Sequence, residues 1–270
     1  MRFPFSVFTK ILIATTIMYV VQSCNDKSSS QDSIDKAGKP LDSKEQTKVF
    51  ERLGASESGL IFSNDIAHDV NTMENLFNFD YFYNGAGVGV EDLNNDGLLD
   101  VFFCGNQVAN KLFVNKGNLK FQDISETANI HTGKMWSNGV TFVDINNDGF
   151  QDIYVSQGGP NNRLNRKNLL LINNQDLTFT ESAEDYGLAD TGITTQSAFF
   201  DYDGDGDLDC IVMNENELYG VDPINLYKMV DTNEEAKYFN SSHLYRNDNG
   251  KFVDITKEAG LQRPIFGLGL

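Results

Sequence analysis

The sequence is poor in histidine and in basic residues, and each shortage argues against a class of protein. Only three histidines occur in 270 residues, and none stands in an H-E-x-x-H pair. The signatures G-x-S-x-G and the P-loop are absent too, so the usual marks of serine hydrolases and phosphate-binding enzymes are missing. Lys and Arg number 21 against 39 Asp and Glu, a formal net charge of −18. This excess argues against a nucleic acid partner, whose phosphates require basic patches.

The chain also lacks an apolar run long enough to span a bilayer, which takes ~20 residues. The apolar segment at residues 11–21 has about eleven, lies between a short basic region and Cys24, and predicts an export signal over residues 1–23. Its end, VQSC (21–24), resembles the bacterial lipobox. That resemblance implies that Cys24 is lipid-modified and anchors the mature protein to the outer membrane, on its periplasmic or its outer side. The alternative is an ordinary secretory signal with a chance cysteine.

No aromatic residue occurs in the segment directly after this signal, residues 24–48, and cysteine is scarce throughout the chain. Residues 24–48 are small and polar, and we expect a flexible tether ahead of a folded region over 49–270. Besides Cys24, the chain has Cys104 and Cys210 only. Both fall in apolar segments of repeat units that are not neighbours. We therefore expect two buried thiols and no disulfide.

Asp, Asn and Gly gather in three copies of one loop: DLNNDGLLD (92–100), DINNDGFQD (144–152) and DYDGDGDLD (201–209). Oxygen-bearing side chains at positions 1, 3, 5 and 9, with Gly at 6, can surround Ca²⁺ with oxygens at roughly 2.3–2.6 Å. One copy would be weak evidence, because these residues also form ordinary turns. Three copies predict three structural calcium sites, in which position 7 offers its backbone carbonyl. The predicted ligands are Asp92, Asn94, Asp96, Leu98, Asp100, Asp144, Asn146, Asp148, Phe150, Asp152, Asp201, Asp203, Asp205, Asp207 and Asp209.

The flanks of these loops exclude an EF-hand. Position 12 is Phe103, Val155 or Val212, where an EF-hand has a bidentate Glu. Short runs rich in β-branched and aromatic residues lie on both sides of each loop and predict strands. The predicted first strands are 87–90, 139–143 and 196–200, and the second are 101–104, 153–155 and 210–213.

Two further segments follow each loop, separated by an Asn- and Gly-rich hairpin turn. They begin at 111, 169 and 243, and then at Phe121, Phe179 and Phe252. Loop starts lie 52 and 57 residues apart, so each unit is a four-stranded antiparallel sheet, as in a β-propeller blade. The alternative is a β-sandwich with coincidental similarity. We therefore predict an all-β protein with three complete blades.

Partial units stand at both ends of the array. Residues 50–60 match a fourth strand, which could complete the last blade of a ring, and residues 267–270 match a first strand. Propellers have 4–8 blades. We therefore expect either a fragment of a longer protein or a ring completed by partner chains.

One stretch, residues 214–241, departs from the repeat and lengthens the third unit. Long loops on a rigid scaffold often carry recognition. Its tyrosines could form a binding surface or could pack the loop down, and they are Tyr219, Tyr227 and Tyr238.

Taken together, the units resemble the FG-GAP/VCBS repeat of integrin-α-type β-propellers, through the D-x-[DN]-x-D-G-x-x-D loop. With N-x-L-[FY]-x-N-x-G and F-x-D-I-[ST]-x-x-A-G-[IL], they are closer to the cartilage-acidic-protein (ASPIC/UnbV-type) branch, which occurs in lipoproteins of Bacteroidetes-like bacteria. The resemblance covers about residues 50–270 and implies calcium at the five loop positions and an adhesion or binding role. The FG-GAP tetrad itself is only loosely echoed at residues 82–87, and the C-terminal module of the branch is absent.

Three functions are compatible with these features. The first is a non-catalytic, calcium-stabilised propeller, lipid-anchored in the cell envelope, that binds a glycan or a protein. The second is a polysaccharide lyase or hydrolase, for which His68, Asp69 and Glu57 are the acid–base candidates. The third is an assembly role in which open blade edges pair with other chains.

Overall fold

The computed structural model describes residues 50–130, 133–160, 166–218 and 221–264. Cys24, Tyr219, residues 1–48 and residues 267–270 therefore lie outside the described residues. The chain divides after Arg52, and Leu53–Leu270 forms one compact unit. None of the described helices is long and apolar enough to cross a membrane.

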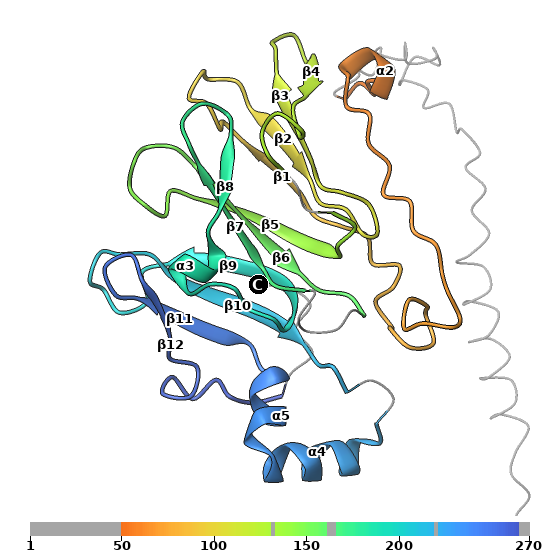
Figure 1. Cartoon of the computed structure of the whole chain (residues 1–270), viewed down its shortest axis with the longest axis vertical. Helices are drawn as coiled ribbons and strands as arrows, with labels where there is room; N and C mark the ends of the chain where they lie inside the picture. Colours follow the sequence, from red (N-terminus) through yellow and green to blue (C-terminus); the bar gives the residue numbers. More distant parts are fainter. Residues whose placement is uncertain (1–49, 131–132, 161–165, 219–220, 265–270) are drawn as a thin grey trace, which may run out of the picture. The chain divides into compact units, whose positions relative to one another are not determined.

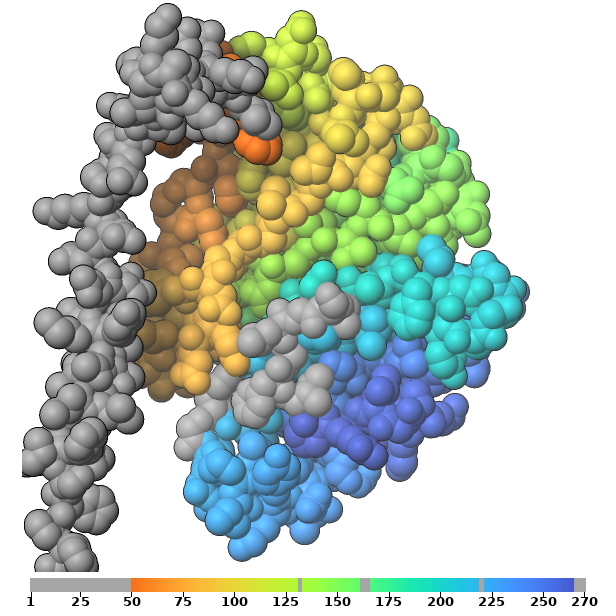
Figure 2. Space-filling view, turned by 180° about the vertical axis from the view of Figure 1, so that it is seen from behind, coloured from red at the N-terminus to blue at the C-terminus, as the bar shows by residue number. Residues whose placement is uncertain are grey.

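Three four-stranded antiparallel sheets make up this unit, in the strand orders β1-β2-β3-β4, β5-β6-β7-β8 and β9-β10-β11-β12. We call them blades 1, 2 and 3, and they follow one another in chain order (Figures 1 and 2). The predicted all-β fold of four-stranded units is confirmed. The strand bounds are β1 Val88–Glu91, β2 Asp100–Phe103, β3 Lys111–Asn115, β4 Phe121–Asp123, β5 Ser137–Val143, β6 Asp152–Gln157, β7 Leu169–Asn173, β8 Phe179–Glu181, β9 Ile193–Phe200, β10 Asp209–Glu215, β11 His243–Asn247 and β12 Phe252–Asp254.

The first strands β1, β5 and β9 lie next to one another, and glycine allows their close approach. A Cβ atom on Gly139 of β5 would come within 2.8 Å of the Thr195 carbonyl oxygen of β9. The register between β5 and β6 shifts near this glycine, and that between β9 and β10 shifts between Met213 and Asn214. The loops predicted to bind calcium join the first strand to the second in every blade. All three therefore lie at the same end of the first strands.

Apolar side chains fill the space between neighbouring blades. One cluster joins blades 1 and 2 through Phe102, Leu112 and Ile153, and another joins blades 2 and 3 through Tyr154, Leu170 and Val212. Burying such side chains stabilises a fold by about 1.5–3 kcal/mol each. Cys104 and Cys210 belong to these clusters as free, fully buried thiols, which confirms the prediction made for them.

The turns that follow the fourth strands of blades 1 and 2 contact the next blade. Asn129 and Gly187 occupy these turns with positive φ angles of 62° and 84°. The Asn129 side-chain amide donates to the Phe179 carbonyl at 3.1 Å, and a Cβ on Gly187 would lie 2.5 Å from the Phe252 carbonyl oxygen. The repeat therefore encodes the joint between blades as well as the blades.

The predicted strand at residues 50–60 is not formed. Residues 50–54 have no regular structure, and Ala55–Ser58 is a short helix, α2, that ends at Gly59 with φ 85°. The resemblance to a blade end was real, however. A Cβ on Gly59 would lie 2.2 Å from the Phe121 carbonyl oxygen, and a Cβ on Gly187 would lie similarly close to the Phe252 carbonyl oxygen of the next blade. The helix before Gly187, α3 (Ala183–Tyr186), is the equivalent of α2. Residues 50–60 form no strand because, among the described residues, no sheet offers them a strand to pair with.

The insertion in blade 3 is helical, so describing it as a loop was wrong. Helix α4 spans Pro223–Thr232 and α5 spans Glu234–Phe239. Asp222 caps α4 by accepting from the amides of Ile224 and Asn225, with Pro223 at the first helical position. The Asp222-Pro223 pair is a helix-start signal that the repeat analysis did not use.

Candidate metal centres

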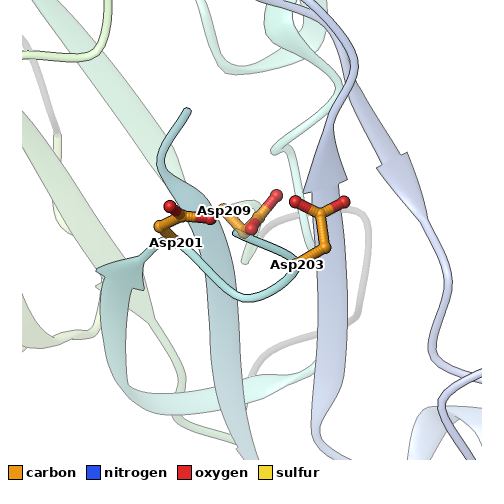
Figure 3. Close-up of side chains that lie close together, drawn as sticks. All are labelled: Asp201, Asp203 and Asp209. Carbon is orange, nitrogen blue, oxygen red and sulfur yellow. The ribbon is translucent and has the colours of Figure 1, made fainter. Parts of the chain in front are cut away.

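The third loop brings carboxylates together around its turn (Figure 3). Single oxygen atoms of Asp201, Asp203 and Asp209 lie within 4.8 Å of one another. Positive φ angles at Gly204 (81°) and Gly206 (99°) produce the tight curvature that this convergence needs. Asp205 and Asp207 belong to the same loop but lie outside this group, and the Asp205 carboxylate accepts from the Asp207 amide at 2.9 Å.

The first two loops repeat one hydrogen-bond scheme. The position-1 carboxylates of Asp92 and Asp144 accept from the amides of positions 5 and 6, at 2.8–3.1 Å. At position 3, the side-chain amides of Asn94 and Asn146 donate to the position-5 carboxylates at 2.9 and 3.1 Å. Carboxylates at position 5, those of Asp96 and Asp148, accept from the position-7 amides at 2.8 and 2.9 Å. The sequence motif therefore specifies one backbone conformation.

The carboxylate at position 9 is buried in each loop and fixes the loop to its blade. The Asp152 carboxylate accepts from the amide of Ile145 at 3.1 Å and from that of Asn173 on β7 at 2.7 Å. Asp100 and Asp209 accept from the equivalent amides. Each carboxylate oxygen keeps a further lone pair after these bonds, so a structural role does not exclude a metal ligand.

The charged form is disfavoured at three of the loop carboxylates, those of Asp100, Asp152 and Asp203, whereas hydrogen bonds from the Phe150 amide and from Gln175 and Asn146 lower the pKa of Asp148 against its slight desolvation. Burial raises the pKa of Asp152 to about 6 and that of Asp100 in the same direction, against backbone hydrogen bonds that lower both. Partial desolvation and the charges of Asp205, Asp209 and Asp201 raise the pKa of Asp203. A divalent cation would relieve this repulsion, and every side-chain donor is an oxygen. The residues present therefore fit a hard cation.

A set of asparagines that the metal analysis did not single out completes each loop. Asn115, Asn173 and Asn247 end the third strands and donate to the position-8 carbonyls of Leu99, Gln151 and Leu208 at 3.0–3.1 Å. Their side-chain oxygens accept from amides in the following hairpin turn. The signal was in the sequence as the second Asn of N-x-L-[FY]-x-N-x-G, whose function was not assigned.

Loops of neighbouring blades also contact each other. The side chain of Asn95 in loop 1 donates to the Gly149 carbonyl of loop 2 at 2.9 Å, and Asn173 of blade 2 donates to the Leu93 carbonyl of loop 1 at 2.8 Å. A change in one loop can therefore reach the next.

Residues considered for other functions lie elsewhere. His68 and Asp69 line an open groove of about 640 Å³, whereas Glu57 lies on α2 and its carbonyl accepts from Lys120 at 2.6 Å. Tyr227 is exposed on α4. Tyr238 stacks on the His243 ring at 4.1 Å and donates to Asp254 at 2.5 Å, so it holds α5 against blade 3.

Comparison with known proteins agrees with this geometry. Residues 92–155 match the FG-GAP-like repeat. The match runs from the first residue of loop 1 to Val155 in β6, and so covers one repeat period together with loop 2 and the first part of β6. No protein of curated function matches the chain.

Among solved structures, the chain is similar to a lectin of Agrocybe aegerita that specifically recognises non-reducing terminal N-acetylglucosamine. Sequence identity is 19% and the TM-score is 0.34, over 62% of this chain and 36% of that one. The chain spans about a third of the length of that structure. At this TM-score the similarity supports no inference about the present chain.

Proposed function

We propose that this protein is a calcium-stabilised, non-catalytic binding scaffold of the FG-GAP-repeat type, exported and lipid-anchored in the cell envelope through Cys24. Its partner is a glycan or a protein. The observation that carries the proposal is the recurrence of one acidic loop, with nearly the same hydrogen bonds, at the same place in three successive blades.

Calcium has a structural role in this proposal. Each ion would be held by the side-chain oxygens at positions 1, 3, 5 and 9 and by the position-7 carbonyls of Leu98, Phe150 and Asp207. It would stabilise the junction of the first two strands, because the carboxylates that converge there repel one another without it. An exported protein meets calcium concentrations at which even weak extracellular sites fill, at dissociation constants on the order of 10⁻⁴–10⁻³ M.

The test combines a binding survey with an assay for turnover. The full chain in millimolar calcium is applied to a glycan array and to solubilised envelope proteins, and the same preparation is incubated with the polysaccharides that it binds. We expect saturable binding that is lost in EDTA, with no release of reducing ends and no unsaturated products. Release of either product would establish the alternative, a polysaccharide hydrolase or lyase. Binding that is unchanged in EDTA would show that the partner binds without calcium and would contradict the calcium-dependent part of the proposal.

A further inference from the structure

Glu215, the last residue of β10, carries a buried carboxylate that the calcium loops do not use. It pairs with Ile193 of β9 in the sheet, and its side chain is only 1% exposed. Neither carboxylate oxygen has a hydrogen-bond donor in bonding geometry within the described part of the chain, although the Tyr81 hydroxyl and the Asn216 amide lie near enough to favour the charged form. The neighbouring Glu217 differs, since it forms an ion pair with Arg166.

The Glu215 side chain lines a cavity of about 250 Å³. Residues 79–86, which precede β1, form one wall against the starts of β5 and β9, where Phe79 and Phe82 pack with Trp136 and Ile193. The remaining lining mixes aromatic and aliphatic side chains with amide and hydroxyl groups, and its polar members are Tyr81, Asn84, Asn138 and Thr195. Since the acidic loops follow the ends of the first strands, this cavity lies at the opposite end of those strands.

The chemistry of this cavity is selective. No Lys, Arg or His is among its lining residues, so the charge of Glu215 disfavours an anionic ligand and no cation offsets it. A buried carboxylate without a counter-charge is costly, and a cation or a set of hydroxyl donors would relieve that cost. Burial raises the pKa of Glu215 to about 7, so the charged form is present at neutral pH and is unstable for want of a counter-charge.

We propose that this cavity binds a ligand group bearing a protonated primary amine, with Glu215 as its counter-ion. A cation is favoured over neutral hydroxyls because one carboxylate lacks a counter-charge and two aromatic side chains, Phe79 and Tyr81, lie beside it and can contribute cation–π attraction. The cavity is smaller than a drug-sized site of roughly 300–1,000 Å³, so it accepts one small unit. An amino sugar or a lysine side chain offers the same group. The inference rests on the proposed binding function and gives it a location.

The test uses titration calorimetry on the full chain in millimolar calcium. The probes are glucosamine and N-acetyl-lysinamide, each paired with its N-acetylated, uncharged counterpart. We expect at least one free amine to bind at least tenfold more tightly than its acetylated counterpart. Glu215→Gln, which keeps the shape but removes the charge, should abolish that preference. Glu126→Gln, at an exposed site in blade 1, should leave it unchanged.

The pH dependence gives a second reading. Below pH 7 the proton and the amine compete for Glu215, so affinity should fall about tenfold per pH unit. Tyr81 is the titratable group that faces Glu215, with Asp80 beside Tyr81. The pKa of Tyr81 is raised above 10 by burial and by Glu215, so its hydroxyl stays protonated over this range.

Equal binding of amine and acetylated probes, binding unaffected by Glu215→Gln, or no saturation by any probe would each overturn the inference. In all three cases a partner found on the glycan array or among envelope proteins would leave the proposed function standing. If Glu215→Gln loses binding to the glycan array and Glu126→Gln keeps it, the amine and the array ligand bind at one site.

Discussion

At the scale of single residues, the asparagine that ends each third strand supports the acidic loop by hydrogen bonds, as the aspartates do. Asn173 is buried, and its side chain donates to two carbonyls, those of Leu93 and Gln151, and accepts from the Gln175 amide. It therefore joins an acidic loop, the following hairpin and the neighbouring blade. No charge marks this residue in the sequence, so its importance depends on packing.

We expect Asn173→Ala to lower the free energy of unfolding by about 1–3 kcal/mol, because the substitution leaves buried backbone groups without partners. The adjacent Asn174, which is exposed and bonds to Thr178, provides the control, and Asn174→Ala should cost less than about 0.5 kcal/mol. Urea unfolding in saturating calcium measures both. Equal losses in the two variants would show that the hydrogen bonds of the Asn173 side chain do not stabilise the fold.

A buried ion pair predicts a pH dependence of stability. Burial alone would lower the pKa of His243, but the adjacent Asp190 carboxylate outweighs this and raises it. Burial would likewise raise the pKa of Asp190, but the charge of His243 and hydrogen bonds from His243, Tyr245 and the Gly192 amide lower it. The other groups facing the pair are Tyr238 and Asp254.

The sign follows from the raised pKa of His243. Its contribution is complete below the unfolded pKa of about 6.5 and is lost as pH rises through the folded pKa, by up to about 1.4 kcal/mol per pH unit. The lowered pKa of Asp190 adds stability that is lost only in acid, below about pH 4. Urea unfolding between pH 6 and 8.5 should show a clearly smaller decline in His243→Gln than in the parent chain and in His68→Gln, an exposed control. Some decline remains in every variant, because Glu215, whose pKa is raised to about 7, also loses stability as pH rises toward 7. A pH slope in His243→Gln as steep as in the parent would refute the assignment.

At the scale of secondary-structure elements, the joints between blades are as regular as the strands. Gly187 adopts φ 84° and lies against the backbone of Phe252 in the next blade, whereas Gly260 adopts φ 72° with open space around it. These two glycines separate the cost of a left-handed backbone from the cost of the contact.

Gly260→Ala should cost about 1 kcal/mol for its positive φ alone. Gly187→Ala should cost a further 1–3 kcal/mol or more, because its Cβ would overlap the Phe252 carbonyl and push blades 2 and 3 apart. Calorimetric melting in calcium compares them. Equal losses would mean that the turn does not hold the blades together.

The strands could be predicted because their signals are local. Short runs rich in β-branched and aromatic residues, hairpin turns and a fixed order of segments placed all twelve strands of blades 1–3. The helices α4 and α5 were missed because repeat comparison treats an insertion as a gap, although Asp222-Pro223 marked a helix start. The strand at residues 50–60 was wrong because strand formation needs a partner, which a local pattern cannot supply.

The candidate sites divide in the same way. The acidic loops are contiguous in sequence, so all fifteen predicted ligands fall in the three equivalent turns. Glu215 stands in an ordinary acidic run, and only the packing of residues 79–86 against β5 and β9, far apart in sequence, buries its carboxylate. Long-range packing of this kind has no local signature.

At the scale of the whole molecule, the proposed anchor makes a prediction about localisation. With Cys24 lipid-modified, the protein should label with radioactive palmitate in a bacterial host that processes lipoproteins, and it should sediment with membranes. Cys24→Ser should lose both properties while the buried Cys104→Ser leaves them unchanged. Equal labelling of Cys24→Ser and the parent, or membrane retention without label, would contradict a lipid anchor.

Calcium stoichiometry tests the central claim most directly. Equilibrium dialysis of the full chain against millimolar calcium should give about three ions per chain. Asp148→Ala, at position 5 of loop 2, should give about two, and Asp176→Ala, in the exposed turn between β7 and β8, should still give about three. No bound calcium in the parent, or the same number in Asp148→Ala as in the parent, would contradict the account.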